Sequence, residues 1–177
     1  MNRDDIANYN VTEHLRDERL LMIRAVRPDD KGLVLEALSG VSPESVYRRL
    51  FTTKKEITEE GLRKVTEVDF DTTVALVAAL DKDGAEQLVG GGRYIRSAGS
   101  PRAEVAFLIE DAFQGFGIAS RIFKHLVAIA RESGIAQFEA EVLPTNEAML
   151  KVFTRSGLAI KKTPSRESVH VLMELTA

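Results

Sequence analysis

A glycine-containing segment in the second half of the chain carries the residue types that bind phosphate groups. Gln114-Gly115-Phe116-Gly117-Ile118-Ala119 follows an apolar run and opens a long amphipathic segment. Glycines at a turn from strand to helix allow backbone N–H groups to converge on a ligand, and the helix dipole favours an anion there. The segment therefore predicts a pyrophosphate-binding loop, with a simple tight turn as the alternative.

Two common nucleotide-binding motifs do not account for this segment. The stretch Gly115–Ser120 lacks the third glycine of a Rossmann motif, and no acidic residue closes the next strand in the required context. The Gly-Lys-Ser/Thr sequence of a Walker loop is also absent. A second run, Gly90-Gly91-Gly92, lies within a predicted strand and no helix follows it. It indicates a β-bulge or a close backbone contact instead of a phosphate loop.

The composition excludes several other chemistries. With no cysteine, the chain has no disulfide, thiolate metal site, Fe–S cluster or cysteine nucleophile. The three histidines, His14, His125 and His170, never occur at metal-ligand spacing, so we expect no metal. Lys and Arg number 24 against 27 Asp and Glu, a net charge of −3, which predicts no nucleic-acid partner.

The same composition predicts a globular protein away from membranes. Hydrophobic residues make up 44% and charged residues 29% of 177 residues, which suits one domain of ordinary size. No apolar run approaches the 18 or so residues of a membrane span, so we expect no membrane partner. The acidic start Met1–Asp5 does not resemble a secretory signal, so we expect a cytoplasmic location.

Hydrophobic periodicity and turn residues predict a mixed α/β sheet. Residues 1–19 are polar and without clear period, and we expect them to form a loose arm. Strands and helices follow one another along the rest of the chain, and Thr72–Leu80 is apolar enough for a strand covered on both faces. The strands are expected at 20–26, 72–80, 87–96, 103–109, 138–143, 158–162 and 169–175, and the helices near 28–39, 42–51, 58–65, 117–132 and 146–156.

Two motifs in the second half resemble the Gcn5-related N-acetyltransferase (GNAT) family. The family's coenzyme-A pyrophosphate loop has the consensus Gln/Arg-x-x-Gly-x-Gly/Ala, which Gln114, Gly117 and Ala119 match. The segment Glu139–Leu158 resembles the family's next strand, a cofactor-contacting asparagine at Asn146, and a helix that closes with a glycine. The two motifs stand in the family's order and at its spacing.

The resemblance extends into the first half of the chain, so that roughly residues 20–175 are covered. Ile23–Asp30 is similar to the opening of many GNAT domains. Ser42–Phe51 and Val65–Ala75 resemble the acetyltransferase domain of bacterial protein lysine acetyltransferases. The resemblance implies a GNAT domain over residues 20–177 without an appended sensor domain. It also implies a mostly antiparallel twisted sheet of six to seven strands flanked by four to five helices.

The resemblance also assigns the site. It implies acetyl-CoA as cosubstrate and Glu104 as the base, although Glu104 could instead be a solvated edge residue. Glu110 and Asp111 would repel a pyrophosphate and are interpreted as turn formers, whereas Glu139 and Glu141 could face a cationic acceptor. Cofactor contacts are implied for the strand backbone and the loop: Phe107, Leu108, Ile109, Gln114, Gly115, Phe116, Gly117, Ile118, Ala119, Ser120 and Asn146.

Several positions leave alternatives open. Many family members have a tyrosine seven residues after the asparagine, to protonate the leaving thiolate, but here Phe153 occupies that position. Arg121 could touch a phosphate or lie on a solvated helix face. Tyr47, Arg48 and Arg49 fall on the helix that in the family borders the acceptor channel, where a structural role is the alternative.

The sequence thus predicts an N-acetyltransferase that acts by direct attack of a primary amine on acetyl-CoA, since no cysteine can carry the acetyl group. The expected acceptor is a protein lysine. The alternatives are a small-molecule amine acetyltransferase and a CoA-binding regulatory module that has lost catalysis, which Phe153 suggests. We expect a monomer or a homodimer.

Overall fold

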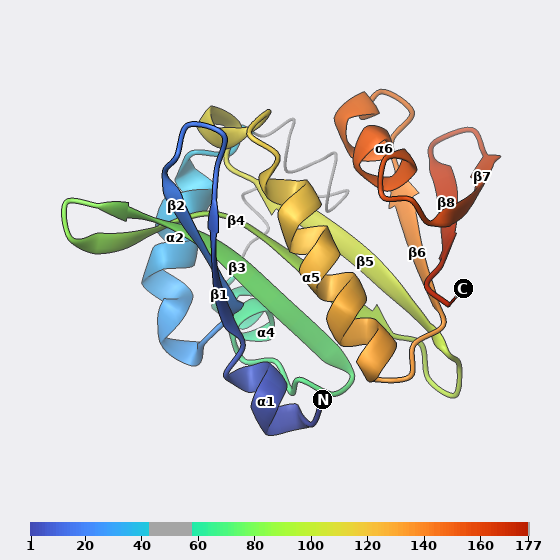
Figure 1. Ribbon diagram of the computed structural model, residues 1–177, viewed down its shortest axis with the longest axis horizontal. Helices are drawn as coiled ribbons and strands as arrows, with labels where there is room; N and C mark the ends of the chain where they lie inside the picture. The colour runs from blue at the N-terminus through green and yellow to red at the C-terminus, as the bar shows by residue number, and fades with distance from the viewer. Residues whose placement is uncertain (43–57, 177) are drawn as a thin grey trace.

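One twisted sheet holds all the strands of the computed structural model, which describes residues 1–42 and 58–176. The helix expected over residues 42–51, with Tyr47, Arg48 and Arg49, lies outside the described residues except for Ser42. The described helices, 3-10 turns (η) and strands are, in chain order, α1 (Arg3–Ala7), β1 (Asn10–His14), β2 (Leu20–Ala25), η1 (Pro28–Asp30), α2 (Lys31–Ser39), α4 (Glu59–Thr66), β3 (Thr73–Lys82), β4 (Ala85–Arg96), β5 (Arg102–Ile109), η3 (Asp111–Phe113), α5 (Ile118–Glu132), β6 (Gln137–Val142), α6 (Glu147–Thr154), β7 (Ala159–Pro164) and β8 (Val169–Glu174) (Figure 1).

The strand order confirms the mixed, mostly antiparallel sheet. Within the described chain the sheet has eight strands in the order β1-β2-β3-β4-β5-β6-β8-β7. Among these strands only β5 and β6 pair in parallel, and α5 connects them. A parallel pair needs such a crossover because the chain must return to the same end of the sheet.

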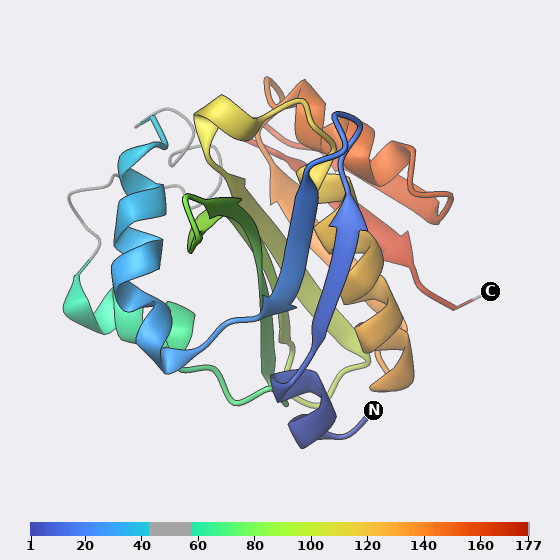
Figure 2. The same cartoon turned by 60° about the vertical axis from the view of Figure 1, so that its left-hand side comes forward.

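Helices cover both faces of the central strands. Along β3, Val74 and Leu76 join the core under α5, whereas Ala75 and Val77 pack with residues of α2 on the other face. Figure 2 shows α2 and α4 on one side of the sheet and α5 on the other. Successive side chains of a strand point to opposite faces, so a strand covered twice must be apolar throughout. This confirms the interpretation of the run Thr72–Leu80.

The first 19 residues are not a loose arm. They form α1 and β1, and β1 pairs antiparallel with β2 to give the sheet its eighth strand. Asn2 caps α1 reciprocally with Asp5, and Ile6 is buried in the core. The hydrophobic pattern missed β1 because one of its inward positions is Glu13, which forms polar contacts with α5 and so hides the alternation.

The glycine run in β4 combines a bulge with close packing. Ala78 and Ala79 of β3 pair with Gly90 and Leu88, so one residue of β4 is left over between them. A Cβ atom on Gly90 would lie 2.6 Å from the Ile109 side chain, and one on Gly92 equally close to the Phe107 ring. The expected bulge and the expected close contact are therefore both present.

The two parallel strands separate soon after they begin to pair. Hydrogen bonding between β5 and β6 joins Arg102, Ala103 and Glu104 to residues 137–139 and then stops. Toward Ile109 and Val142 the strands diverge (Figure 1). Backbone groups on this edge of β5 are consequently left without a strand partner and are available to hydrogen-bond a ligand.

Candidate active site

The turn from β5 into α5 presents backbone N–H groups at the start of a helix. Gly115 and Gly117 both have left-handed backbone, with φ values of 88° and 77°. Gly117 is the N-cap of α5 and forms no side-chain cap, whereas Thr58 and Asn146 cap α4 and α6. The first N–H groups of α5 therefore have no acceptor within the helix and lie at the positive end of its dipole. This arrangement suits an anion such as a pyrophosphate.

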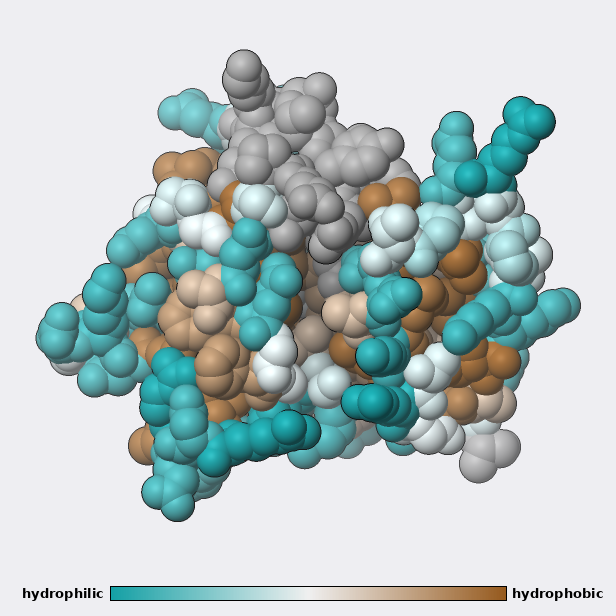
Figure 3. Space-filling view, turned by 90° about the horizontal axis from the view of Figure 1, so that it is seen from above, coloured by the Kyte–Doolittle hydropathy of each residue, from teal (hydrophilic) through white to brown (hydrophobic). Residues whose placement is uncertain are grey.

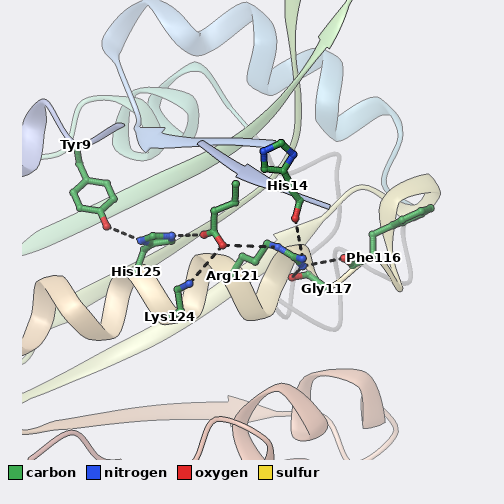
Figure 4. Close-up of polar contacts among 8 residues, drawn as sticks. Tyr9, His14, Phe116, Gly117, Arg121, Lys124 and His125 are labelled. Atoms are coloured by element: carbon green, nitrogen blue, oxygen red, sulfur yellow. Dashed lines mark hydrogen bonds and ion pairs between the residues drawn. The ribbon is translucent and has the colours of Figure 1, made fainter. Parts of the chain in front are cut away.

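Arg121 holds the carbonyl groups of this turn. Its Nη1 donates to the carbonyl oxygens of Phe116 and Gly117 at 3.2 and 3.1 Å, and its Nη2 donates to that of His14 at 3.2 Å (Figure 4). A Cβ atom at position 117 would lie only 2.7 Å from Arg121 Nη1. Arg121 thus stabilises the loop and ties it to β1, which favours a positioning role over the phosphate contact that the sequence left open.

A second set of polar contacts fixes β1 to α5 (Figure 4). Glu13 is hydrogen-bonded to Nε2 of His125 and lies 3.5 Å from Nζ of Lys124. Nδ1 of His125 is 2.6 Å from the Tyr9 hydroxyl. Burial alone would raise the pKa of Glu13, but the hydrogen bonds and charges of His125 and Lys124 outweigh it and lower that pKa. Sequence reasoning missed this cluster because β1 and α5 are more than a hundred residues apart in the chain.

A cavity of about 360 Å³ lies between the end of β5, the glycine turn and α6. Most of the residues that the sequence assigned to the cofactor line it: Leu108, Ile109, Gln114, Gly115, Gly117, Ile118, Ala119, Ser120 and Asn146. Phe107 and Phe116 do not. The Phe107 ring packs in the core against Phe123, and the Phe116 ring lies 5.3 Å from the guanidinium of Arg19.

Two side chains of this cavity are partly committed to local structure. Oδ1 of the buried Asn146 accepts from the Met149 N–H at 3.4 Å, which leaves its Nδ2 group to donate to a ligand. Nε2 of Gln114 donates to the Ile109 carbonyl at 3.2 Å and so supports the turn. Both residues therefore shape the cavity as well as line it.

Glu104 lies on the sheet face opposite α5. Its neighbours Ala103 and Val105 are buried in the core under α5, and alternation along β5 places Glu104 on the other face, exposed to solvent. Ile95 of β4 and Glu139 of β6 flank it, so it is not an edge residue. Within the described part of the chain, Glu104 forms no ion pair.

The neighbouring carboxylates on β6 have partners. Glu139 lies 3.6 Å from Nη1 of Arg102 and 3.5 Å from Nε2 of His170. Glu141 accepts from the Ser168 hydroxyl and pairs with Nδ1 of His170, both at 2.6 Å. Burial alone would raise the pKa of Glu141, but these two contacts outweigh it and lower that pKa. His170 thus bridges two carboxylates, a role that sequence reasoning missed because it depends on the register of β6 and β8.

A second cavity, of about 300 Å³, lies on the α2 and α4 side and is mostly apolar. Leu108 of β5 lines both cavities, so a single strand separates them. Glu110 lines the second one, and its Oε2 is buried without a hydrogen-bond partner in residues 1–42 and 58–176. Burial, followed by the nearby charge of Glu36, raises the pKa of Glu110. Its backbone also forms the expected turn, since its carbonyl accepts from the Phe113 N–H at 2.9 Å.

Phe153 belongs to the core. It is 1% exposed, and its ring centroid lies 5.3 Å from that of Phe123 and 6.3 Å from that of Phe107. These rings join α6, α5 and β5, so the position where a tyrosine acid would stand is filled by aromatic packing.

The described residues contain no group of three or more His, Asp or Glu side chains that could hold a metal ion. No helix in the described part of the chain is both long and apolar enough to span a bilayer.

A family model described as an acetyltransferase (GNAT) domain matches residues 20–159. The chain belongs to the GNAT acetyltransferase family. An acetyltransferase of Pseudomonas aeruginosa is 28% identical over 92% of this chain and 87% of its own length. Acetyltransferase Pat of Mycolicibacterium smegmatis is 32% identical over 76% of this chain, which spans only 40% of that relative.

Solved structures show the same GNAT fold. The GNAT domain of S. lividans PAT superposes with a TM-score of 0.83 at 33% identity, over 93% of this chain and 96% of that one. A cAMP-binding acyltransferase from Mycobacterium smegmatis gives a TM-score of 0.65 at 26% identity, over 99% of this chain and 50% of that one. The sheet with diverging parallel strands is thus the GNAT acetyltransferase architecture.

GNAT acetyltransferases use acetyl-CoA as cosubstrate, and this chain fits that molecule at its phosphate end. The start of α5 lacks a side-chain cap, and a Cβ atom at Gly117 would collide with Arg121 of α5, which binds the carbonyl groups of the loop. A backbone cradle of this kind binds an anion without help from side chains.

Proposed function

We propose that this GNAT acetyltransferase transfers the acetyl group of acetyl-CoA to the primary amine of a protein lysine by direct attack. The observation that carries the proposal is the cavity between the end of β5, the glycine turn and α6, with the uncapped start of α5 at its end. Glu104 also belongs to β5. It lies on the sheet face opposite α5, from which the acceptor would approach.

The first task of the protein is to take a proton from the acceptor. A lysine ammonium with a pKa near 10.4 is only about one part in 2,500 neutral at pH 7. Removal of its proton at that pH therefore costs roughly 4–5 kcal/mol. Glu104 is exposed and without an ion pair in the described residues, so its carboxylate is available to accept that proton directly or through a water. This is the role that we assign to it.

The second task is to stabilise the charge that develops on the thioester oxygen. Acetyl-CoA, when bound, supplies an activated acyl group: the new C–N bond forms first, and the C–S bond then breaks and releases CoA as its thiolate. Backbone N–H groups of β5 beyond Glu104 have no partner on β6. Such preorganised donors act most strongly where water is excluded.

The state of the carboxylates favours a single ammonium over a polycation. Glu139 and Glu141 of β6 already pair with Arg102 and His170, so these two neighbouring carboxylates are not free to hold a polyamine. Their neighbour Glu104 on β5 forms no ion pair with any described residue. The resemblance of Val65–Ala75 to protein lysine acetyltransferases supports the same acceptor.

Mass spectrometry of acetyl transfer tests the proposal. The purified protein is incubated with acetyl-CoA and a panel of lysine-containing proteins, polyamines and free amino acids. We expect acetyl-lysine on protein substrates. Transfer to small amines alone would establish the small-molecule alternative. Tight acetyl-CoA binding without any transfer would instead favour the regulatory module that Phe153 suggests.

A further inference from the structure

Three cationic side chains from two distant parts of the chain line the cofactor cavity. Arg16 comes from the turn between β1 and β2, and Lys151 and Arg155 come from α6 and its C-terminal end. All three are exposed, and none forms an ion pair with any other described residue. Figure 3 looks onto this end of the molecule, where hydrophilic side chains project outward beside apolar ones.

The turn that carries Arg16 is fastened to the cofactor loop. The guanidinium of Arg19 lies 5.3 Å from the ring centroid of Phe116 and 5.8 Å from that of Phe113. Leu15 is 3% exposed and anchors the turn in the core. Arg121 donates both to the loop and to the carbonyl of His14, directly before the turn. Arg16 is thus held at the cavity by contacts that do not involve its own guanidinium.

These cations are not needed for the pyrophosphate. The N–H groups at the start of α5 already provide its donors. Coenzyme A carries a further phosphate, the 3′-phosphate of its adenosine, which is close to a dianion at neutral pH. Arginine binds such a group through two parallel N–H donors, and lysine binds it as a point charge.

We propose that Arg16, Lys151 and Arg155 form a subsite for the 3′-phosphate, so that this protein distinguishes CoA from dephospho-CoA. The proposal rests on the proposed use of a CoA thioester. It makes the N-terminal hairpin, whose first strand and turn lie outside the span of the family match, part of the cofactor site.

Isothermal titration calorimetry with CoA and with dephospho-CoA tests this. The two ligands differ only in the 3′-phosphate. We expect the wild-type protein to bind CoA at least tenfold more tightly. Arg16→Gln and Arg155→Gln should each weaken CoA binding about tenfold, as loss of a charged hydrogen bond does, and leave dephospho-CoA binding within about twofold. Higher salt should reduce the preference for CoA.

Arg63→Gln is the matched control, because this exposed arginine lies on α4 and does not line the cavity. It should change neither affinity. Equal binding of both ligands by the wild-type protein would overturn the subsite and leave the proposed function intact. An equal loss of both affinities in Arg16→Gln would also overturn it, since the residue would then act on the whole loop. Binding of neither ligand would overturn the proposed function and this proposal with it.

Discussion

At the scale of single residues, Glu104 combines exposure with the absence of an ion pair in the described chain, whereas its neighbour Glu139 is paired. We expect Glu104→Gln to lower kcat about 10²- to 10⁴-fold at pH 7 while the affinity for acetyl-CoA stays unchanged. The defect should shrink as the pH rises toward the lysine pKa of about 10.4, because the acceptor then loses its proton unaided. The measurement is kcat/KM against pH for both proteins.

Glu60→Gln serves as the control for that experiment. Glu60 is 75% exposed on α4 and pairs loosely with Lys64, so its charge should not affect turnover. A Glu104→Gln defect of the same size at every pH would show that the residue positions another group instead of accepting a proton. An unchanged rate would remove it from the mechanism.

The left-handed backbone of Gly117 is the other residue-scale feature on which the site depends. In Gly117→Ala the new Cβ meets Arg121 Nη1 at 2.7 Å, and the left-handed conformation itself costs about 1–2 kcal/mol. We expect the loop to shift and the affinity for CoA to fall at least tenfold, as measured by calorimetry.

A second glycine with left-handed backbone serves as a control, because it separates the effect of backbone strain from the effect of the contact with Arg121. Gly84, in the β3–β4 turn, has a φ of 86°, and a Cβ atom on it would meet no other atom within 4 Å among the described residues. Gly84→Ala should therefore lose a similar amount of stability without any change in CoA affinity. Equal loss of CoA affinity in both variants would mean that the Gly117 effect is global.

At the scale of elements, a buried ion pair joins β2 to the start of α2. Arg24, 1% exposed, donates two hydrogen bonds to Asp30 at 2.9 and 2.8 Å and a third to Glu86 of β4 at 3.0 Å. We expect Asp30→Ala to cost about 3–5 kcal/mol in urea unfolding, because it leaves a buried guanidinium short of its counter-charge. Removing the exposed carboxylate of Glu60 should cost less than about 1 kcal/mol, and a similar loss in both variants would contradict this role.

The same pair gives that stability a pH dependence. Burial alone would raise the pKa of Asp30, but hydrogen bonds from Arg24 and the Arg27 N–H outweigh it and lower that pKa. A lowered carboxyl pKa contributes stability that is present above the unfolded value, about 3.9, and is lost as the pH falls through the folded value. Acid unfolding of the wild-type protein should be steeper than that of Asp30→Asn.

Whether the sequence predicted an element depends on whether the inward side chains of that element are apolar. The stripe of α5 from Ile118 to Ala130 and the apolar run of β3 are buried by packing alone, so periodicity revealed them. Strand β1 places Glu13 inward against His125, and its alternation is therefore invisible to hydrophobicity. The strand that the sequence did not predict was the one with a charged residue, Glu13, on its inner face.

The features of the candidate site likewise fall into those that the sequence predicted and those that it did not. Backbone-driven features, such as the turn at Gly115 and Gly117 and the helix that begins near Asn146, have local sequence signatures and were predicted. Contacts between distant segments were not. His170 meets Glu141 only through the register of β6 and β8, and Arg16 reaches the cavity only because β1 pairs with β2.

At the scale of the whole molecule, the α5 face and one edge of the sheet depend on the N-terminal segment. It supplies Ile6 and Leu15 to the core and Glu13 to the polar cluster on α5. It also covers the edge of β2, which would otherwise expose unpaired backbone groups. These residues lie before the span of the family match at 20–159, so this is a part of the fold that the family pattern alone does not describe.

Removal of residues 1–19 therefore distinguishes an integral segment from a loose arm. Ile6 and Leu15 are 2% and 3% exposed, and burial of such side chains contributes about 1.5–3 kcal/mol each. We expect the truncated protein to unfold at a clearly lower urea concentration and to lose its preference for CoA over dephospho-CoA, since Arg16 is removed. Arg3→Gln in the full chain is the control, because its ion pair with Asp71 is exposed and contributes little. An unchanged unfolding midpoint after truncation would show that β1 adds nothing to the stability of the sheet.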